Sequence, residues 1–318
     1  RDYYASRGLG DVYKRQASEP MALWGGSWTE QKLDAFAKYV AAYLTIMNNY
    51  RDKYNWKLIY FDGFAGSGSR GESEPNDETD KGLFDISEID IDKSESEVYV
   101  GAAERVLQIS IRGFDYYYFN ERNQESINAL KAKLSRYSSV NARLEFRCND
   151  ANAELLKLSK ALHNDRHLKA LVLLDPFGMQ LDWESIASLK GSGADVWILV
   201  PTGVIINRLL DGKGELLFSN KLQKFFGMSE SEIRSFFYED RTEMTLFGEE
   251  KYCYKLPNAI RRIANLYITK LSEIFKYVLK EPLILYNRRG IPIFHFVFAS
   301  NNQSASKIVS EIVVKINS

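Results

Sequence analysis

The sequence "LIYFDGFAGSG" (58–68) joins a short apolar run to a glycine-rich loop, with Asp62 at the junction. The run has the length and apolar character of a strand that is buried on both faces. Glycines that follow a strand allow backbone amide groups to approach a ligand closely. The stretch therefore predicts an α/β fold with a ligand-binding turn at the carboxyl end of a buried strand.

Two common uses of a glycine loop fit this stretch poorly. A phosphate loop needs Lys followed by Ser or Thr after its last glycine, whereas the chain continues as "SRGE" (69–72). Residues 66–71 match the dinucleotide pattern G-x-G-x-x-G, but that pattern opens directly into a helix and precedes an acid by about 20 residues. Here a polar segment with Pro75 follows, and the next strand-ending acid is Glu121. A dinucleotide-dependent oxidoreductase remains a weaker alternative.

The segment "DGFAGSG" (62–68) resembles the methionine-binding corner of S-adenosylmethionine-dependent methyltransferases. Within it, "FAGSG" resembles the F-x-G-x-G motif of the enzymes that methylate amino groups. The resemblance implies S-adenosylmethionine as the cofactor, a ligand without phosphate. The implied cofactor-binding residues of the loop are Asp62, Gly63, Phe64, Ala65, Gly66 and Gly68. The alternative is an ordinary turn, because glycine is common after a strand.

Acidic residues also follow three later strands, as Glu121, Asp150 and Asp175. The carboxyl ends of parallel strands meet at one edge of a sheet, so we expect these carboxylates to gather near Asp62. In methyltransferases of this type, an acid at the place of Glu121 binds the ribose hydroxyls and an acid at the place of Asp150 binds the adenine amino group. An acid after a strand can also be a solvated loop residue or a helix cap. For Asp150, a cap of the following helix stays open as an alternative.

The sequence "DPFG" (175–178) resembles the Asp-Pro-Pro-Tyr motif of amino methyltransferases. The resemblance implies that Asp175 and the carbonyl of Pro176 orient the target amine, and that Phe177 stacks on its base. Phe177 stands where that motif has its second proline, and Gly178 stands where it has an aromatic residue. The acceptor therefore need not be a base, and a plain turn is the alternative.

Apolar strand-like segments alternate with amphipathic helical segments from residue 57 onward. The predicted strands are 57–62, 115–119, 143–148, 169–175 and 195–200. Near-continuous apolar strands separated by helices are typical of a parallel sheet that is covered on both faces. We predict an α/β fold with a doubly wound, mostly parallel, seven-stranded sheet of the Rossmann-like methyltransferase type, preceded by a helix from Trp28.

The alternation stops after Leu210. Residues 211–280 are predicted to be a helical insertion that ends in a long helix over 257–280. A C-terminal antiparallel hairpin before a closing helix is predicted from the segments "PLILYN" and "IPIFHFVFAS", which flank "RRG". Basic residues beside aromatic ones in this region suit a nucleic-acid face; an ordinary solvated helix face is the simpler alternative. The basic residues are Arg261, Arg262, Lys270, Lys276, Lys280, Arg288 and Arg289.

Taken together, these motifs resemble the three-Cys-motif partner family. The resemblance rests on Trp28 and Lys32 in the leading helix, on "YFDGFAGSG", "FNERN" and "LLDPFG", and on "INR" (206–208) after the fifth strand. It covers about residues 22–300 and implies a methyltransferase-type fold together with a three-cysteine partner protein. It does not imply a particular reaction.

The composition further limits the classes of protein and of binding site that fit the chain. Lys and Arg total 42, as do Asp and Glu, so the whole chain lacks the basic excess of a non-specific nucleic-acid binder. Two cysteines and three histidines are too few for a disulfide framework, and they predict no metal site. No apolar run is long enough for a bilayer, so we expect no membrane association and a cytoplasmic location.

The domain boundaries follow from the same composition. Residues 1–20 contain "DVYKRQ", which resembles the translated end of a transposon used to prepare sequencing libraries, so we expect this segment to be non-native or disordered. We expect residues 21–318 to be one methyltransferase-like domain. Residues 69–96 form an acidic loop within that domain.

The sequence therefore predicts a methyltransferase that acts on an amino group, of nucleic acid or of a nucleotide. The main alternative is a catalytically inactive scaffold of the same fold that binds a partner protein or nucleic acid.

Overall fold

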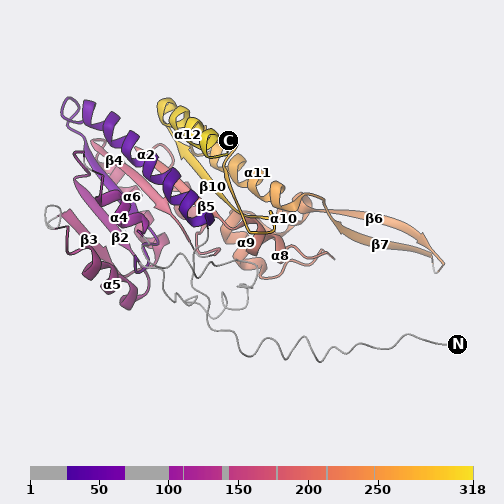
Figure 1. Cartoon of the computed structure of the whole chain (residues 1–318). Coiled ribbons are helices and arrows are strands. Elements are labelled where there is room, and N and C mark those ends of the chain that lie inside the picture. The colour runs from indigo at the N-terminus through magenta and orange to yellow at the C-terminus, as the bar shows by residue number, and fades with distance from the viewer. Residues whose placement is uncertain are drawn as a thin grey trace.

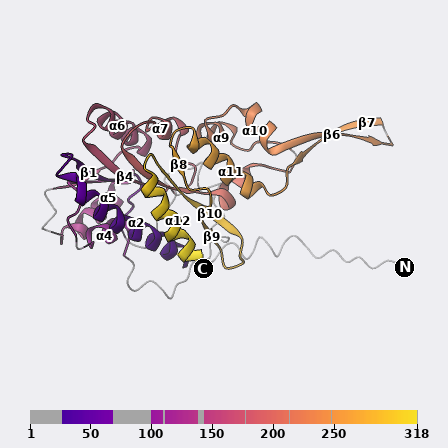
Figure 2. The ribbon, with the colours of Figure 1, turned by 90° about the horizontal axis from the view of Figure 1, so that it is seen from above.

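The computed structural model describes residues 27–68, 100–109, 111–137, 143–176, 178–212, 214–246 and 248–317. Within these ranges, a large sheet carries helices on both of its faces, and a hairpin projects from one end (Figures 1 and 2). The expected N-terminal segment 1–20 and the acidic loop 69–96 lie outside the described residues. No helix in the described ranges is both long and apolar enough to cross a membrane.

The central sheet has the strand order β3-β2-β1-β4-β5-β10-β8, and β9 pairs with β10 beside this path. Its strands are β1 (Lys57–Asp62), β2 (Tyr116–Asn120), β3 (Leu144–Arg147), β4 (Leu168–Leu174), β5 (Ala194–Val200), β8 (Tyr277–Val278), β9 (Leu283–Tyr286) and β10 (Pro292–Ser300). The first five strands in chain order are parallel, and β10 runs antiparallel to β5. The path of seven strands and the hairpin β9–β10 confirm the predicted fold class, and β9 raises the number of strands in the sheet to eight.

Two helical layers cover this sheet (Figure 2). One layer contains α2 (Ser27–Arg51), α4 (Ala102–Leu107) and α12 (Gln303–Asn317), which contact one another through α2. The other layer contains α6 (Ala151–Asn164), α7 (Trp183–Ala187) and α11 (Ala259–Ser272). Trp183 of α7 packs edge-on against Tyr267 of α11, with ring centroids 5.7 Å apart. Helix α5 (Gln124–Leu134) follows β2.

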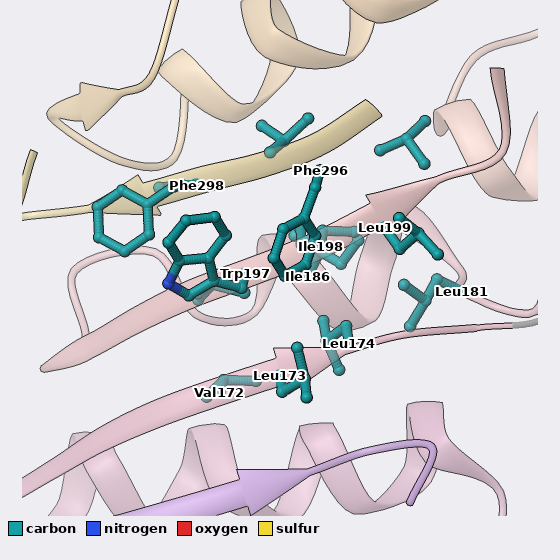
Figure 3. Packing of buried hydrophobic residues seen from close by; sticks show 14 of the residues in the cluster. Val172, Leu173, Leu174, Leu181, Ile186, Trp197, Ile198, Leu199, Phe296 and Phe298 are labelled. Carbon is teal, nitrogen blue, oxygen red and sulfur yellow. The ribbon is translucent and has the colours of Figure 1, made fainter. Parts of the chain in front are cut away.

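Trp197 of β5 is fully buried in the core, where it lies beside aromatic side chains of β10 (Figure 3). Its ring lies 4.5 Å from that of Phe296 and 5.2 Å from that of Phe298, both on the neighbouring strand β10. From α2, Phe36 and Tyr39 approach the same ring at 6.3 and 5.7 Å. Aromatic side chains of this size bury large apolar areas, so this cluster fixes the leading helix against the sheet.

The segment between β5 and β8 differs from the predicted helical insertion. It contains the helices α8 (Asn207–Leu209), α9 (Ser219–Phe226), α10 (Glu230–Phe237) and α11, and also the hairpin of β6 (Tyr238–Thr245) and β7 (Gly248–Lys255). This hairpin projects from the body (Figure 1), and most of its residues are exposed. Strands that are exposed on both faces need no alternation of apolar and polar residues, so the residue pattern did not indicate strands there.

The long helix predicted over 257–280 is also shorter than expected. Helix α11 ends at Ser272, and Tyr277 and Val278 instead pair with Ser300 and Ala299 of β10. Beyond Ser272 the run of apolar residues continues, but a short apolar run fits a strand as well as a helix. Hydrogen-bonded pairing with the edge of β10 favours a strand over a helix at Tyr277 and Val278.

Candidate functional site

The sheet has a topological switch point between β1 and β4. From β1 the chain continues towards β2 and β3, whereas from β4 it continues towards β5 on the other side. Helices on opposite faces leave a crevice at such a point, just beyond the carboxyl ends of the two strands. Asp62 ends β1, and Asp175 directly follows β4, so both predicted acids lie at this switch point.

Asp62 is a buried carboxylate, only 2% exposed. The amide of Phe64 donates to its Oδ1 at 3.2 Å, and the hydroxyl of Tyr60 donates to its Oδ2 at 3.1 Å. Burial, followed by the negative charge of Asp175, raises the pKa of Asp62 to about 7. Burial disfavours the charged form, and so does a like charge nearby. The site therefore contains a carboxyl group that changes its charge near neutral pH.

Asp175 is paired with a lysine from the leading helix. The Nζ of Lys32 lies 2.5 Å from Oδ2 of Asp175, and Lys32 is almost fully buried. The ammonium group also lies 5.6 Å from the centre of the Trp28 ring, within the range of a cation–π contact. This lysine thus offsets part of the charge of Asp175.

Backbone hydrogen bonds hold the glycine turn between β2 and β4. The amide of Gly63 donates to the carbonyl of Leu173 at 3.0 Å, and the amide of Ala65 donates to the carbonyl of Asn120 at 2.9 Å. Gly66 and Gly68 both have a positive φ, of 61° and 69°, a conformation that glycine adopts without steric cost. The glycines are thus required by the backbone of this turn, which confirms a turn but not a ligand.

Glu121 binds this turn directly. Its Oε2 accepts from the amide of Gly66 at 3.1 Å, and its Oε1 accepts from the amide of Asn123 at 2.9 Å. The structure therefore brings Glu121 to the same corner as Asp62, as predicted. Its contact with ribose hydroxyls stays a prediction.

Asn120 is a buried residue of this corner that sequence reasoning missed. Its Nδ2 donates to the carbonyls of Gly63 and Asn149, at 3.1 Å in each case, and so joins the turns after β1 and β3. Its Oδ1 is buried and has no hydrogen-bond partner among the described residues. A buried acceptor without a partner is unfavourable, so this oxygen suits a ligand that donates a hydrogen bond. The sequence feature that could have indicated this residue is an amide side chain at the end of an apolar strand.

The other predicted site residues are less closely connected. Asp150 caps α6, because its Oδ1 accepts from the amide of Ala153 at 3.0 Å; this is the alternative that the sequence left open. Its contact with an adenine stays a prediction. Pro176 is buried next to Asp175, and Phe177 lies outside the described residues. Within the described ranges, no three His, Cys, Asp or Glu side chains are grouped to hold a metal ion.

No protein-family model and no curated protein matches this chain. Among solved structures, the chain is similar to protein LPL1258 of Legionella pneumophila, of family model DUF519, with 16% identity and a TM-score of 0.40 over 77% of this chain and 93% of that one. It is also similar to yhhF of Escherichia coli, a candidate methyltransferase, with 12% identity and a TM-score of 0.25 over 67% of this chain and 84% of that one.

A third similar structure is a candidate caffeoyl-CoA O-methyltransferase of Staphylococcus aureus. It has 13% identity and a TM-score of 0.29 over 78% of this chain and 97% of that one. The similarity is low in all three cases, so the fold rests on the strand order of the chain itself. Membership of the three-Cys-motif partner family stays a prediction.

Proposed function

We propose that the protein is an S-adenosylmethionine-dependent methyltransferase that acts on an amino group of a nucleotide or nucleic acid. The observation that carries the proposal is the placement of buried Asp62, its glycine turn and the Lys32–Asp175 pair at the switch point of the sheet. The resemblance of "DGFAGSG" and "DPFG" to methyltransferase motifs supports the same assignment.

The residues of the corner fit the cofactor chemically. Asp62 would provide a buried carboxylate for the ammonium group of the methionine part, and Glu121, at the same glycine turn, would accept hydrogen bonds from the ribose hydroxyls. The Oδ1 of Asn120, which has no partner within the described residues, adds a further acceptor. When bound, S-adenosylmethionine supplies a methyl group on a positively charged sulfur.

Asp175 then orients the acceptor. Its carboxylate would accept a hydrogen bond from the acceptor amine and would hold the amine nitrogen in a fixed orientation. Alignment of this kind and exclusion of water provide much of the rate in such transfers. Lys32 holds the carboxylate in a fixed position.

The same ion pair favours a second candidate function. Lys32 occupies Oδ2 of Asp175, which an acceptor amine would otherwise use. A methyltransferase-like scaffold that binds S-adenosylmethionine, a three-cysteine partner protein or nucleic acid without turnover would keep this pair closed. Methyl transfer, rather than cofactor binding, separates the two functions.

The first experiment is a thermal unfolding measurement with S-adenosylmethionine, S-adenosylhomocysteine and NAD. A ligand at a hundred times its dissociation constant stabilises the protein by about 2.7 kcal/mol, and we expect this shift with the first two compounds. Absence of a shift with either at millimolar concentration would reject the proposed cofactor. A shift with NAD alone would favour the oxidoreductase.

The second experiment measures transfer of a labelled methyl group to nucleotides, DNA and RNA, alone and with candidate partner proteins. Label in an acceptor supports the enzyme. Cofactor binding without label in any acceptor supports the scaffold.

A further inference from the structure

A cavity of about 550 Å³ lies between α11, α8 and the hairpin β9–β10. His295 of this hairpin pairs with Val200, the last residue of β5. The cavity is therefore beyond the carboxyl end of β5, on the same edge of the sheet as Asp175 but on the other side of that strand. Ligand pockets in proteins commonly have volumes of roughly 300–1,000 Å³.

The N-terminus of α11 opens into this cavity. Ala259, Ile260 and Arg261 form the first turn, and all three line the cavity. The first helical amide with a partner belongs to Arg262, which donates to the carbonyl of Asn258 at 3.0 Å. Asn258 precedes the helix with a φ of 58° and does not cap it with its side chain. The amides of this first turn thus carry the positive end of the helix dipole and suit an anion.

Two cationic side chains lie at the exposed part of the wall. Arg261 and Lys280 both line the cavity and are both exposed. Within the described ranges, neither forms an ion pair, although Glu281 also lines the wall. The charged residues of the wall therefore sum to one positive charge. A guanidinium beside free backbone amides is a common arrangement for binding phosphate oxygens.

A buried histidine also lines the cavity. His295 is 5% exposed, and its Nδ1 lies 2.7 Å from the hydroxyl of fully buried Thr202. Its Nε2 has no partner among the residues that the structure describes. If the hydroxyl donates to Nδ1, the neutral ring carries its hydrogen on Nε2, and if Nδ1 donates, Nε2 is an acceptor. In either tautomer Nε2 offers a hydrogen-bonding atom to whatever occupies the cavity.

The wall that carries this histidine is firmly packed. Thr202 begins a π-helical turn (Thr202–Ile206) directly after β5, and such turns are often found at functional sites. Within it, Gly203 lies so close to β10 that a Cβ atom would be 2.0 Å from the carbonyl oxygen of Pro292. The position of His295 relative to Thr202 is thus fixed by main-chain contact.

The remainder of the wall is suited to an organic group. Asn207 and Asn265 contribute amide side chains, and Ile260, Ile268 and Ile284 contribute apolar surface. Inorganic phosphate would leave most of this volume and apolar surface uncovered. Amides together with aliphatic surface match a base and ribose, which present hydrogen-bonding edges and apolar faces.

We infer that this cavity binds a phosphate monoester of nucleotide size, with its phosphate at the N-terminus of α11 between Arg261 and Lys280. His295 forms a hydrogen bond with the ligand through Nε2. The inference rests on the contacts of this cavity and does not depend on methyl transfer at Asp62 and Asp175.

The test is calorimetric titration of the whole protein with AMP, adenosine and inorganic phosphate. We expect AMP to bind, phosphate to bind more weakly and to compete with AMP, and adenosine to bind at least tenfold more weakly than AMP. Arg261→Glu should weaken AMP binding by about tenfold to a hundredfold, the range for a lost hydrogen bond to a charged group, and Lys280→Glu should act in the same direction. Both side chains are exposed, so neither change should disturb folding.

Lys307→Glu is the matched control, because it makes the same charge change on an exposed residue of α12, which packs against α2. Its AMP affinity should equal that of the unchanged protein. No binding of AMP and phosphate at millimolar concentration would overturn the inference, as would equal binding of AMP and adenosine or equal losses in Arg261→Glu and Lys307→Glu. S-adenosylmethionine binding measured on Arg261→Glu should stay unchanged, so failure of this inference and failure of the proposed function give different results.

Discussion

The ammonium group of Lys32 lies 2.5 Å from Oδ2 of Asp175, although 143 residues separate them in the chain. This ion pair joins the leading helix to the end of β4, and Asp175 in turn acts on the charge of Asp62. The candidate site is therefore one electrostatic unit of two acids and one base. A change in Asp175 therefore affects both its ion pair with Lys32 and the pKa of Asp62.

Replacing Lys32 with Met should lower the free energy of unfolding by about 2 kcal/mol. The change leaves Asp175 beside Asp62 without its positive partner, and breaking a buried ion pair on one side is costly. We place the value below that of a fully buried pair because the Asp175 side chain is 23% exposed. Urea unfolding measures the effect. Lys38→Met, on an exposed position of the same helix, is the control and should cost well under half as much.

The stability of the protein should fall as pH rises from about 4 to about 7, in part because of Asp62. The pKa of this group is about 7 in the folded chain and about 3.9 when unfolded. The folded state therefore holds the proton over a range in which the unfolded state has lost it. That stabilisation is complete below pH 4 and is lost as pH rises through 7; it is on the order of 4 kcal/mol.

Asp62→Asn removes this titration and should flatten the pH profile of unfolding over the same range. Urea unfolding at about pH 5 and about pH 8 measures both proteins. A variant whose profile falls as steeply as that of the unchanged protein would show that another group is responsible.

The affinity for S-adenosylmethionine should rise between about pH 5.5 and about pH 7.5, if Asp62 binds the ammonium group as proposed. Only the ionised carboxylate attracts that cation, and its pKa of about 7 places the change in this window. Calorimetry should show about one proton released on binding at the lower pH. A pH-independent affinity would place the ammonium group elsewhere.

Asp175→Asn should abolish methyl transfer while changing cofactor affinity less than threefold. The amide keeps the size of the side chain but loses the charge that orients an amine, a loss worth about 10²-fold or more in comparable catalytic sites. Transfer of label and calorimetry measure the two effects separately. Loss of cofactor binding in this variant would mean that Asp175 belongs to the cofactor site instead.

Gly68→Ala should destabilise the protein more than Gly66→Ala. Both positions have a positive φ, so alanine costs about 1 kcal/mol at each. A Cβ at Gly68 would also lie 2.7 Å from Cδ1 of buried Leu130, whereas at Gly66 no atom of the described residues lies within 4 Å. Equal losses in urea unfolding would show that Leu130 moves aside without cost.

The strands of the central sheet could be predicted because they are apolar on both faces. β1, β4 and β5 lie within one residue of the segments predicted from composition alone. The acids at their ends followed from the same pattern, since parallel strands bring their carboxyl ends together. Asp62, Glu121 and Asp175 were found in this way.

The remaining features depend on contacts between distant segments. Nothing in the sequence near Lys32 indicates that it pairs with Asp175, and only the bond to the amide of Ala153 shows that Asp150 caps α6. Asn120 escaped notice because an amide after a strand is usually solvated. Its burial arises from the turns after β1 and β3, which close over it.

The hairpin β6–β7 can open locally, with a free energy separate from that of unfolding the central sheet. Its strands pair with each other and not with the central sheet, so its hydrogen bonds can open while every strand of the core stays closed. A two-stranded hairpin by itself is only marginally stable, and local opening of this kind has its own, smaller free energy. Amide exchange in this arm therefore reports a local equilibrium, whereas exchange in β1, β4 and β5 reports unfolding of the whole domain.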